Sequence, residues 1–538
     1  MIMKRLIDYL KKMEQKGHVV VTLALVLIFS APSTAQFRGG NFQPPPLDPL
    51  VEQIVKEANE NSHLEQLAHE LLDIVGPRLV GTPQMDHAHN WAVETFKKWG
   101  ISAENQQFGE WRGWERGISH IDLIHPRVKT LYGTQLAWSP TTGGKPVEGE
   151  VVVLPNVQDS TEFQAWLPSV KGKFVMVSML QPTGRPEYNW REFATEESLN
   201  NIRAARAAAS REWADRIRRT GVTTASLPGV LEEAGAAGVV MSYWSNEFGS
   251  NKIFGASTTK VPTIDISLED YGVIFRLAES GQKPRLRVET ESKELGKVPI
   301  FNTIAEIKGT EFPDEYVILS AHLDSWEGGS GATDNGTGTV TMMEVARILK
   351  KLYPNPKRTI LIGLWGSEEQ GLNGSRAFVI DNPDVIAKTQ AVFNQDNGTG
   401  RVSQINGSGF LHAYDFMGRW LSAAPIGVQR HIETTFPGMP TGGSSDHASF
   451  IAAGIPAFML SALSWGYGTI TWHTNLDTYD KLVFDDLKNN VILIATLAYQ
   501  ASEEPELVNR EQRLLPAGQD GRPGVWPQIR QPRRLGGF

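Results

Sequence analysis

Seven acidic and histidine side chains in the second half of the chain stand where a metal site could form. Each follows a short apolar run or lies in a glycine-rich turn or a late loop: His322, Asp324, Asp334, Glu368, Glu369, Asp396 and His473. The chain has no cysteine, so any bound metal must be held by imidazole and carboxylate groups. These donors suit zinc, and less often manganese or cobalt.

The number of candidate ligands distinguishes one metal ion from two. There are five of them: His322, Asp334, Glu369, Asp396 and His473. Five are too many for one tetrahedral catalytic zinc that keeps an open position, but they fit two ions that share a carboxylate. Asp334 lies in the glycine-rich turn 328–338 and is the best candidate for that bridge. We therefore expect two zinc ions (Zn²⁺) per chain, which would clamp the attacking water and the oxygen that accumulates charge.

Two further carboxylates have expected roles beside these ligands. Glu368 is adjacent to Glu369, so one carboxylate can bind metal while Glu368 stays free to take a proton from the attacking water. Asp324 lies two residues after His322, close enough to accept the second ring N–H and fix the tautomer of that imidazole. We assign Glu368 as the general base and Asp324 as the partner of His322.

The segments that must position these residues alternate between strand-like and helix-like patterns. The predicted strands are Tyr316–Ala321, Thr359–Trp365, Ala391–Phe393 and Pro456–Ser461, and the predicted helices are Thr337–Leu352, Leu411–Ser422 and Phe484–Ser502. Such alternation favours an α/β fold with a mostly parallel sheet that helices cover on both faces. Ligand sites in these sheets lie beyond the carboxyl ends of the strands, which is where the acidic and histidine residues fall.

The amino terminus and the composition indicate an exported protein. Basic residues, the apolar run Val19–Ala31 and the small residues Ser33 and Ala35 predict a signal peptide cut after Ala35; an uncleaved anchor helix is the alternative. We expect a periplasmic or secreted protein with no stable membrane span after signal removal. The net charge of −8 gives no reason to expect a nucleic-acid partner.

Several runs of residues resemble the co-catalytic zinc exopeptidase family. The runs at the predicted metal site are Ser320–Ser325, Gly331–Gly336, Trp365–Gly371 and Ser445–His447. That family includes bacterial leucyl aminopeptidases, glutamate carboxypeptidase and glutaminyl cyclase. The carboxypeptidase Q branch, also called plasma glutamate carboxypeptidase, is further resembled by Phe301–Ile307, Gly76–Leu79 and Trp114–Gly117. The resemblance spans residues 50–502.

This resemblance implies how the ligands are shared. His322 and Asp396 would hold one zinc ion. His473 and Glu369 would hold the other, Asp334 would bridge the two, and a cis peptide bond would follow Asp334. The implied reaction is hydrolysis of a peptide bond next to a chain terminus, with a peptide or dipeptide as substrate. Carboxypeptidase Q-like proteins also suggest a homodimer.

The sequence patterns divide the chain into segments, and the resemblance identifies the peptidase domain and the insert. The segments are a signal peptide (1–35), a linker (36–50), the N-terminal part of the peptidase domain (51–148), a smaller β-rich protease-associated insert (149–293), the zinc peptidase domain (294–504) and a flexible tail (505–538). The insert shows short Val-rich strands and an Arg-rich helical run over 195–220, and none of its residues has catalytic spacing.

Two residues outside the ligand set are candidates for contact with substrate. Tyr467 shortly precedes His473 in a Gly-flanked loop and could polarise the scissile carbonyl, with a packed loop tyrosine as the alternative. His447 follows Asp446, as in the aminopeptidases, whereas carboxypeptidase Q has a Thr-Asp pair without the following His. This difference leaves the cleaved end open between an aminopeptidase and a carboxypeptidase Q-like dipeptidase.

Two other functions are compatible with the same fold. A glutaminyl cyclase-type acyltransferase would use one zinc ion, so the number of metal ions per chain separates it from the peptidase. A catalytically inactive, receptor-like binding protein would have lost ligands, whereas this chain keeps all five.

Overall fold

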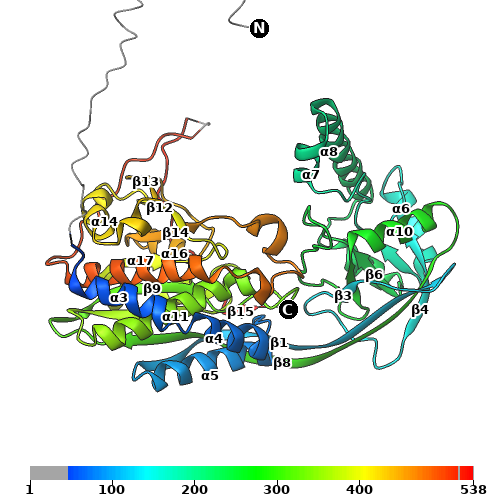
Figure 1. Cartoon of the computed structure of the whole chain (residues 1–538). Helices are drawn as coiled ribbons and strands as arrows, with labels where there is room; N and C mark the ends of the chain where they lie inside the picture. Colours follow the sequence, from blue (N-terminus) through cyan, green and yellow to red (C-terminus); the bar gives the residue numbers. More distant parts are fainter. Residues whose placement is uncertain (1–45, 519–520, 537–538) are drawn as a thin grey trace, which may run out of the picture. The chain divides into compact units, whose positions relative to one another are not determined.

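The computed structural model describes residues 46–518 and 521–536 (Figure 1). The predicted signal peptide and residues 36–45 of the predicted linker lie outside the described residues. From Leu47 onward the described residues form one compact unit. No helix in this part of the chain is long and apolar enough to cross a membrane.

The metal-site residues belong to a mixed, mostly parallel sheet, which confirms the predicted α/β class. Its strands are β8 (Arg285–Ile307), β9 (Phe312–His322), β10 (Arg358–Trp365), β11 (Thr389–Asn394), β12 (Val402–Asn406), β13 (Glu433–Thr435) and β14 (Ala457–Ala462). β9 lies between β10 and β11 and is parallel to both, and β14 is parallel to β11. β8 and β12 flank these four strands in antiparallel orientation. The carboxyl ends of the four parallel strands therefore meet at one edge.

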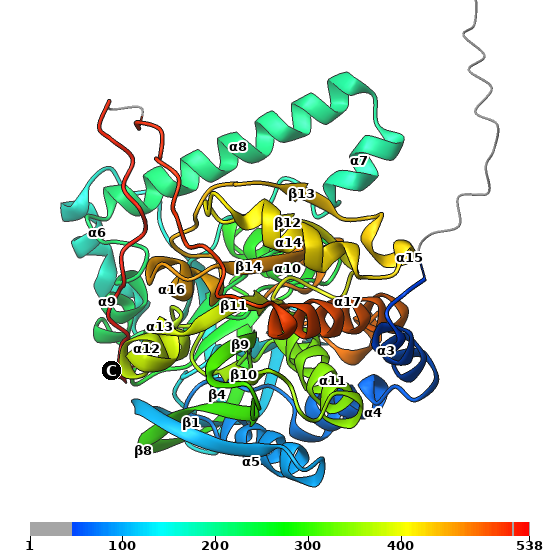
Figure 2. The same ribbon diagram turned by 90° about the vertical axis from the view of Figure 1, so that its left-hand side faces the viewer.

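Helices cover both faces of this sheet because its central strands are apolar on both sides. In β9, Val317 and Leu319 belong to one hydrophobic cluster, whereas Ile318, between them, belongs to another. The first cluster packs against α3 (Pro49–Glu60), α4 (Leu64–His69), α5 (Pro83–Lys98), α11 (Thr337–Leu352), α14 (Ala413–Ser422), α15 (Ile426–Gln429) and α17 (Phe484–Glu503). The second packs against α12 (Asn373–Asp381), α13 (Pro383–Ala387) and α16 (His447–Ala452). Figure 2 shows β9, β10 and β11 between the two layers.

Local sequence explains where two of these helices begin. The side chain of Asp48 accepts a hydrogen bond from Leu50 N at the start of α3, and a proline occupies the first turn. Thr82 does the same for Met85 N at the start of α5, again with a proline in the first turn. A capping oxygen satisfies an amide that the helix leaves unpaired, and proline has no amide to lose there.

A long antiparallel ribbon of β1 (Ser102–His125) and β8 was not predicted from the sequence. Its register runs from Ser102 opposite Glu306 to His125 opposite Arg285, and Figure 1 shows the two strands side by side along their length. The sequence of β1 is rich in polar residues, and its side chains mix buried and exposed positions without strict alternation. A half-exposed ribbon therefore leaves no clear period-two signal in the sequence.

A second group of strands continues from the far end of β8. It contains β4 (Val147–Val153), β5 (Phe174–Met176), β6 (Gly238–Met241), β7 (Thr263–Ile266) and β3 (Gly133–Gln135), while β2 (Lys129–Thr130) pairs with β1. Its helices are α6 (Ser160–Trp166), α7 (Glu187–Phe193), α8 (Glu196–Arg219), α9 (Leu227–Glu233) and α10 (Leu268–Glu279). This group has hydrophobic clusters of its own. The sequence predicts a domain boundary at residue 293, and β8 passes through this position without a break. The division of the chain into domains therefore stays a prediction.

The described part of the tail makes specific contacts, although its composition predicts a loosely ordered segment. Trp526 Nε1 donates to the carbonyl oxygen of Ile451 at 2.9 Å. The guanidinium of Arg534 binds both carboxylate oxygens of Asp381 at 2.7 and 2.9 Å. The final described residues form β15 (Leu535–Gly536), which pairs in parallel with β1. A few anchoring side chains thus fix a segment rich in proline, glycine and arginine.

We expect Gly109→Ala to release the end of the tail from β1. A Cβ atom at Gly109 would overlap the main chain of Arg534, whose carbonyl oxygen accepts from Glu110 N at 2.7 Å. The overlap should cost about 1–3 kcal/mol of unfolding free energy, measured by urea denaturation, and should speed amide exchange in residues 526–536. Gly418→Ala in α14 is the control, because open space surrounds that position. Unchanged exchange in the tail of Gly109→Ala would contradict this account.

Candidate metal centre

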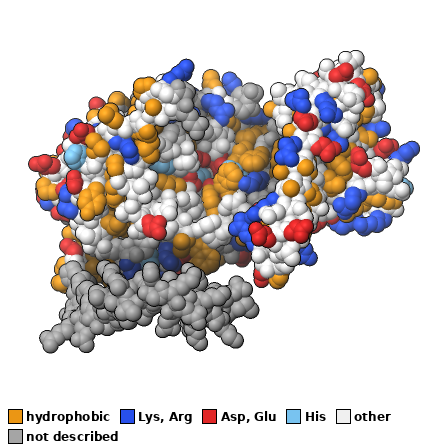
Figure 3. All heavy atoms as spheres, turned by 90° about the horizontal axis from the view of Figure 1, so that it is seen from above, with side chains coloured by type: hydrophobic (Ala, Val, Ile, Leu, Met, Phe, Trp, Pro, Cys, Tyr) orange, Lys and Arg blue, Asp and Glu red, His pale blue; other side chains and the backbone are white. Residues whose placement is uncertain are grey.

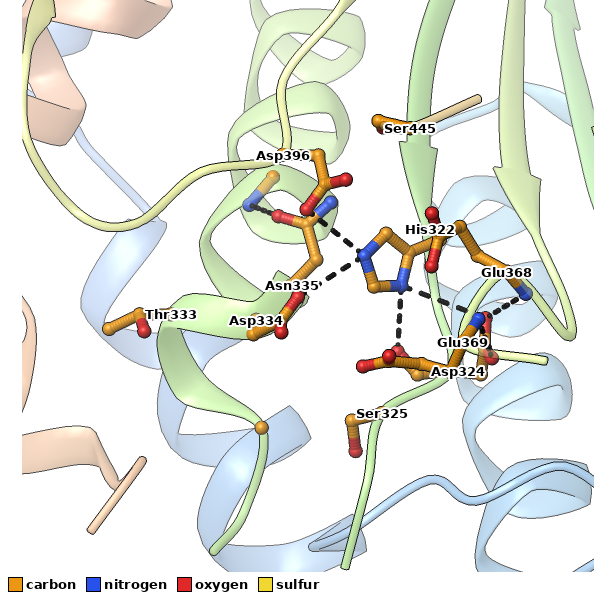
Figure 4. Close-up of polar contacts among 12 residues, drawn as sticks. His322, Asp324, Ser325, Thr333, Asp334, Asn335, Glu368, Glu369, Asp396 and Ser445 are labelled. Atoms are coloured by element: carbon orange, nitrogen blue, oxygen red, sulfur yellow. Dashed lines mark hydrogen bonds and ion pairs between the residues drawn. The ribbon is translucent and has the colours of Figure 1, made fainter. Parts of the chain in front are cut away.

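The structure brings the predicted ligands together at the carboxyl ends of the parallel strands. His322 is the last residue of β9, Glu369 follows β10, and Asp396 follows β11. Asp334 lies in the turn before α11, and His473 comes from the loop after the helical turn Tyr467–Thr471. Figure 4 shows His322 at the centre of this arrangement, directed toward Asp334 and Asp396.

The five candidate ligands form two groups that share Asp334. In the first group, His322 Nε2 lies 3.1 Å from Asp396 Oδ1 and 3.4 Å from Asp334 Oδ1. In the second group, His473 Nε2 lies 2.9 Å from Glu369 Oε2 and 3.1 Å from Asp334 Oδ2. The two oxygens of one carboxylate therefore face two different imidazoles.

The orientation of Asp334 is set by an unusual turn and by a buried partner. The peptide bond from Asp334 to Asn335 is cis, as the family resemblance implies. Asn335 Nδ2 donates to the carbonyl oxygen of Gln395 at 2.9 Å, which ties the turn to the segment carrying Asp396. Asp477 accepts from Thr333 N at 2.8 Å and from Asp334 N at 3.1 Å. Contacts to the main chain of residues 333–335 thus fix the position of the Asp334 carboxylate.

Arg78 fixes the loop between β9 and the turn of Asp334. Its guanidinium is fully buried and donates to the carbonyl oxygens of Leu323 at 2.6 Å, Ser330 at 2.7 Å and Gly331 at 2.9 Å. Burial lowers the pKa of Arg78 to about 10, opposed by the carboxylates of the site, of which Asp477 acts most strongly. Arg78 therefore remains a cation at neutral pH and adds one fixed positive charge behind the site.

The electrostatics of the cluster follow from an excess of buried carboxylates. Burial alone would lower the pKa of His473, but Glu369 and Asp334 raise it to about 9. Burial raises the pKa of Glu369 to about 7, and the charge of Asp334 acts in the same direction. The pKa of His322 is raised well above its usual value by its acidic neighbours, Asp396 first, against the effect of burial. The group attracts positive charge, as protons or as metal ions.

The donor set fits a pair of divalent cations. Zinc binds imidazole nitrogen and carboxylate oxygen at about 2.0–2.2 Å, so adjacent donors of a tetrahedron lie roughly 3.3–3.6 Å apart. The separations of 2.9–3.4 Å within the two groups are close to this range. Glu369 Oε1 is buried and accepts no hydrogen bond from the described residues, as expected of an atom reserved for a metal.

Glu368 and Asp324 lie beside the ligands but belong to neither group. Burial raises the pKa of Glu368 well above its usual value, and the positive charge of His322 opposes this shift. The carboxylate of Asp324 accepts from Glu368 N at 3.0 Å and from Glu369 N at 3.2 Å. His322 Nδ1 lies 2.9 Å from the main-chain oxygen of Asp324 and 3.7 Å from its carboxylate. The residue predicted to orient His322 therefore does so mainly through its carbonyl, while its carboxylate holds the Glu368–Glu369 turn.

The two predicted substrate-facing residues, Tyr467 and His447, differ in the charges that act on them. Burial raises the pKa of Tyr467 well above its usual value, with further contributions from Asp334 and Asp396. His447 is buried at the start of α16, and burial lowers its pKa to about 4. The charge of its neighbour Asp446 acts on Glu368, whereas His447 belongs to neither ligand group.

The sequence-based site lacked residues that the structure adds. Arg78 lies in the run Gly76–Leu79, and Asp477 lies in the same late loop as His473. The charged side chains of these two residues were the only signal by which the sequence could have marked them as part of the site. The loop 250–256 had no signal, because its residues lie far from the ligands in sequence. Its Ile253 N nevertheless donates to the carbonyl oxygen of His473 at 3.0 Å.

Comparisons with known proteins point to one family. The sequence profile described as peptidase family M28 matches residues 302–498. Carboxypeptidase Q of Mus musculus is 26% identical over 443 residues, which cover 82% of this chain and 86% of that protein. The protein of the same name in Bos taurus is 27% identical over 454 residues, covering 84% and 87%.

Two solved structures share the fold. A peptidase M28 precursor from Shewanella amazonensis SB2B is 22% identical, with a TM-score of 0.62, and covers 87% of this chain and 98% of its own. A zinc aminopeptidase from Bacillus subtilis is 18% identical, with a TM-score of 0.51, and covers 84% and 97%.

Asp477→Asn should weaken metal binding without unfolding the chain. The amide would keep one acceptor and turn an NH₂ group toward the second main-chain N–H, loosening the turn of Asp334. Loss of such a supporting contact lowers metal affinity by about 10–100-fold, measured by competition with a chelator. Asp480→Asn, at an exposed position in the same loop region, is the control. Equal zinc affinity of Asp477→Asn and the unaltered protein would rule out this role.

Proposed function

Because this chain belongs to peptidase family M28 and is a zinc metallopeptidase related to carboxypeptidase Q, we propose that it is an exported exopeptidase with two metal ions per chain. The observation that carries the proposal is the position of Asp334 between His322 and His473, with one oxygen toward each. A site for one ion has no need of a carboxylate that faces two ways, which argues against a glutaminyl cyclase-type activity.

Glu368 is the general base in this proposal. Bound cations supply Lewis-acid stabilisation of developing negative charge and lower the pKa of water. Glu368 takes a proton from the attacking water as the water oxygen adds to the scissile carbonyl carbon. When the bond between that carbon and the leaving nitrogen breaks, Glu368 returns the proton to the nitrogen. Asp324 holds Glu368 in place through the main-chain N–H groups of the Glu368–Glu369 turn.

Tyr467 is proposed to act as a hydrogen-bond donor. Burial first, and then the nearby carboxylates, raise the pKa of its phenol well above the usual value, so the phenol keeps its proton at neutral pH. A neutral O–H group beside the metal ligands can donate to the oxygen that gains charge during attack.

Three further properties belong to the same proposal. Residues 1–35 act as a signal peptide and direct the protein to the periplasm or the outside of the cell. Residues 149–293 form a protease-associated insert beside the active site, which is supported by two hydrophobic clusters that these residues build together with a few residues of 121–136. The chain assembles as a homodimer.

Glu368→Gln should remove turnover and leave the metal site occupied. The amide cannot accept the proton from water, so kcat should fall by about 10²–10⁴-fold, measured on unblocked dipeptides and aminoacyl anilides. Metal content and circular dichroism should stay unchanged, because Glu368 is not a ligand. Glu369→Gln is the contrast, since this change should lower metal content as well. Near-normal turnover of Glu368→Gln would refute this mechanism.

Metal analysis of the purified protein should give two zinc ions per chain. Asp334→Asn should retain fewer, because the amide keeps only one of the two oxygens and its NH₂ group cannot bind a cation, so one of the two groups loses a donor. Chelation should abolish activity reversibly and lower Tm, since a ligand at 100 times its Kd contributes about 2.7 kcal/mol of stability. One zinc ion per fully active chain would favour the cyclase-type alternative instead.

A further inference from the structure

The loop 250–256 of the insert extends the metal site. Asn251 N donates to Asn475 Oδ1 at 2.7 Å, and Asn475 N donates to the carbonyl oxygen of Asn251 at 3.0 Å. Between these contacts, Lys252 pairs with Thr474 as in an antiparallel strand. The loop therefore holds the main chain directly after His473. Residues 252 and 254 lie on one side of the loop, as alternate residues of a strand do.

Phe254 of this loop flanks His473 together with Trp326, from the segment after β9, and Trp472, which directly precedes His473 in the chain. Phe254 meets the imidazole of His473 edge to face, with ring centroids 5.5 Å apart. Trp326 packs against Phe254 at 5.4 Å, and Trp472 lies against His473 at 4.1 Å. These rings form an apolar wall beside the second ligand group. Figure 3 shows hydrophobic, acidic and histidine side chains gathered in the hollow of this face.

Lys252 supplies a positive charge next to that wall. Its Nζ lies 3.7 Å from the centroid of the Trp472 ring. The side chain is partly buried, and no described carboxylate lies within ion-pair distance of its ammonium. Partial burial lowers the pKa of Lys252, and the charge of Asp334 opposes this shift. Arg78, the buried cation behind the site, already donates to main-chain carbonyl oxygens. Among the described residues, Lys252 is thus a cation without an ion-pair partner on the side of the site that Trp472 lines.

We propose that Lys252 binds the free carboxylate at the C-terminal end of a short peptide substrate. The chain of contacts from Lys252 through Trp472 to His473 places the ammonium within reach of one or two residues from the metal ligands, at about 3.3–3.6 Å per residue. Phe254 and Trp326 pack against the apolar side chains of the same substrate. This inference rests on the proposed exopeptidase function and selects unblocked dipeptides over long or blocked peptides.

The test compares Phe-Leu, which has a free carboxylate, with Phe-Leu amide and Phe-Glu amide. The unaltered protein should favour the free acid over its amide by at least about 10-fold in kcat/KM. Lys252→Met should lower kcat/KM for the free acid by about 10–100-fold, chiefly through KM, and leave Phe-Leu amide unchanged. Lys252→Arg should keep most of the preference. Lys260→Met changes an exposed lysine of the insert that pairs with Glu233, and it should alter nothing.

Each other outcome has a distinct meaning. Equal rates on the acid and the amide by the unaltered protein overturn the inference, and this comparison needs no variant. An equal loss on both substrates in Lys252→Met also overturns it. A loss confined to Phe-Glu amide assigns the carboxylate to a substrate side chain and overturns the terminal assignment. No hydrolysis of any peptide by the zinc-loaded protein overturns the proposed function itself, whereas hydrolysis without discrimination overturns only the inference.

Discussion

The concentration of buried carboxylates around Asp334 is the constraint on which the rest of the structure depends. Glu368, Glu369 and Asp396 lie in the same buried region, and a buried charge is costly unless an opposite charge compensates it. Two imidazoles and Arg78 supply part of that compensation. The strand ends and the turn before α11 hold the carboxylates close together despite their mutual repulsion. Bound cations would balance the remaining negative charge.

The candidate ligands could be predicted from the sequence because most of them follow or lie in a recognisable local pattern. An apolar run long enough to cross the sheet predicts a buried strand, and an acidic or histidine residue at its end then lies at a known edge. His322 and Asp396 follow this rule closely in β9 and β11. Asp334 needed only a glycine-rich turn before a helix. The same logic cannot show which oxygen of Asp334 faces which imidazole, since that depends on the cis turn and Asp477.

The sequence did not predict features whose structure depends on a few individual contacts rather than on the average composition or periodicity of a segment. The ribbon of β1 and β8 is half exposed and carries many polar residues, so it has no strong periodic pattern. In the tail, Trp526 and Arg534 anchor a segment whose average composition predicts little order. The approach of Lys252 to Trp472 joins residues far apart in the chain. Such contacts arise only after the fold has formed, and no local pattern encodes them.

The register of the ribbon also favours an order of folding. His125 and Arg285 close the shortest loop between β1 and β8, whereas Ser102 and Glu306 close the longest. Pairing across long loops is slow because chain entropy must be lost before the contacts form. Pairing that starts at His125 and Arg285 would extend along the ribbon toward Ser102 and Glu306. β8 borders β10 through residues 303–307, so pairing in this direction would reach the strands that carry the candidate ligands last.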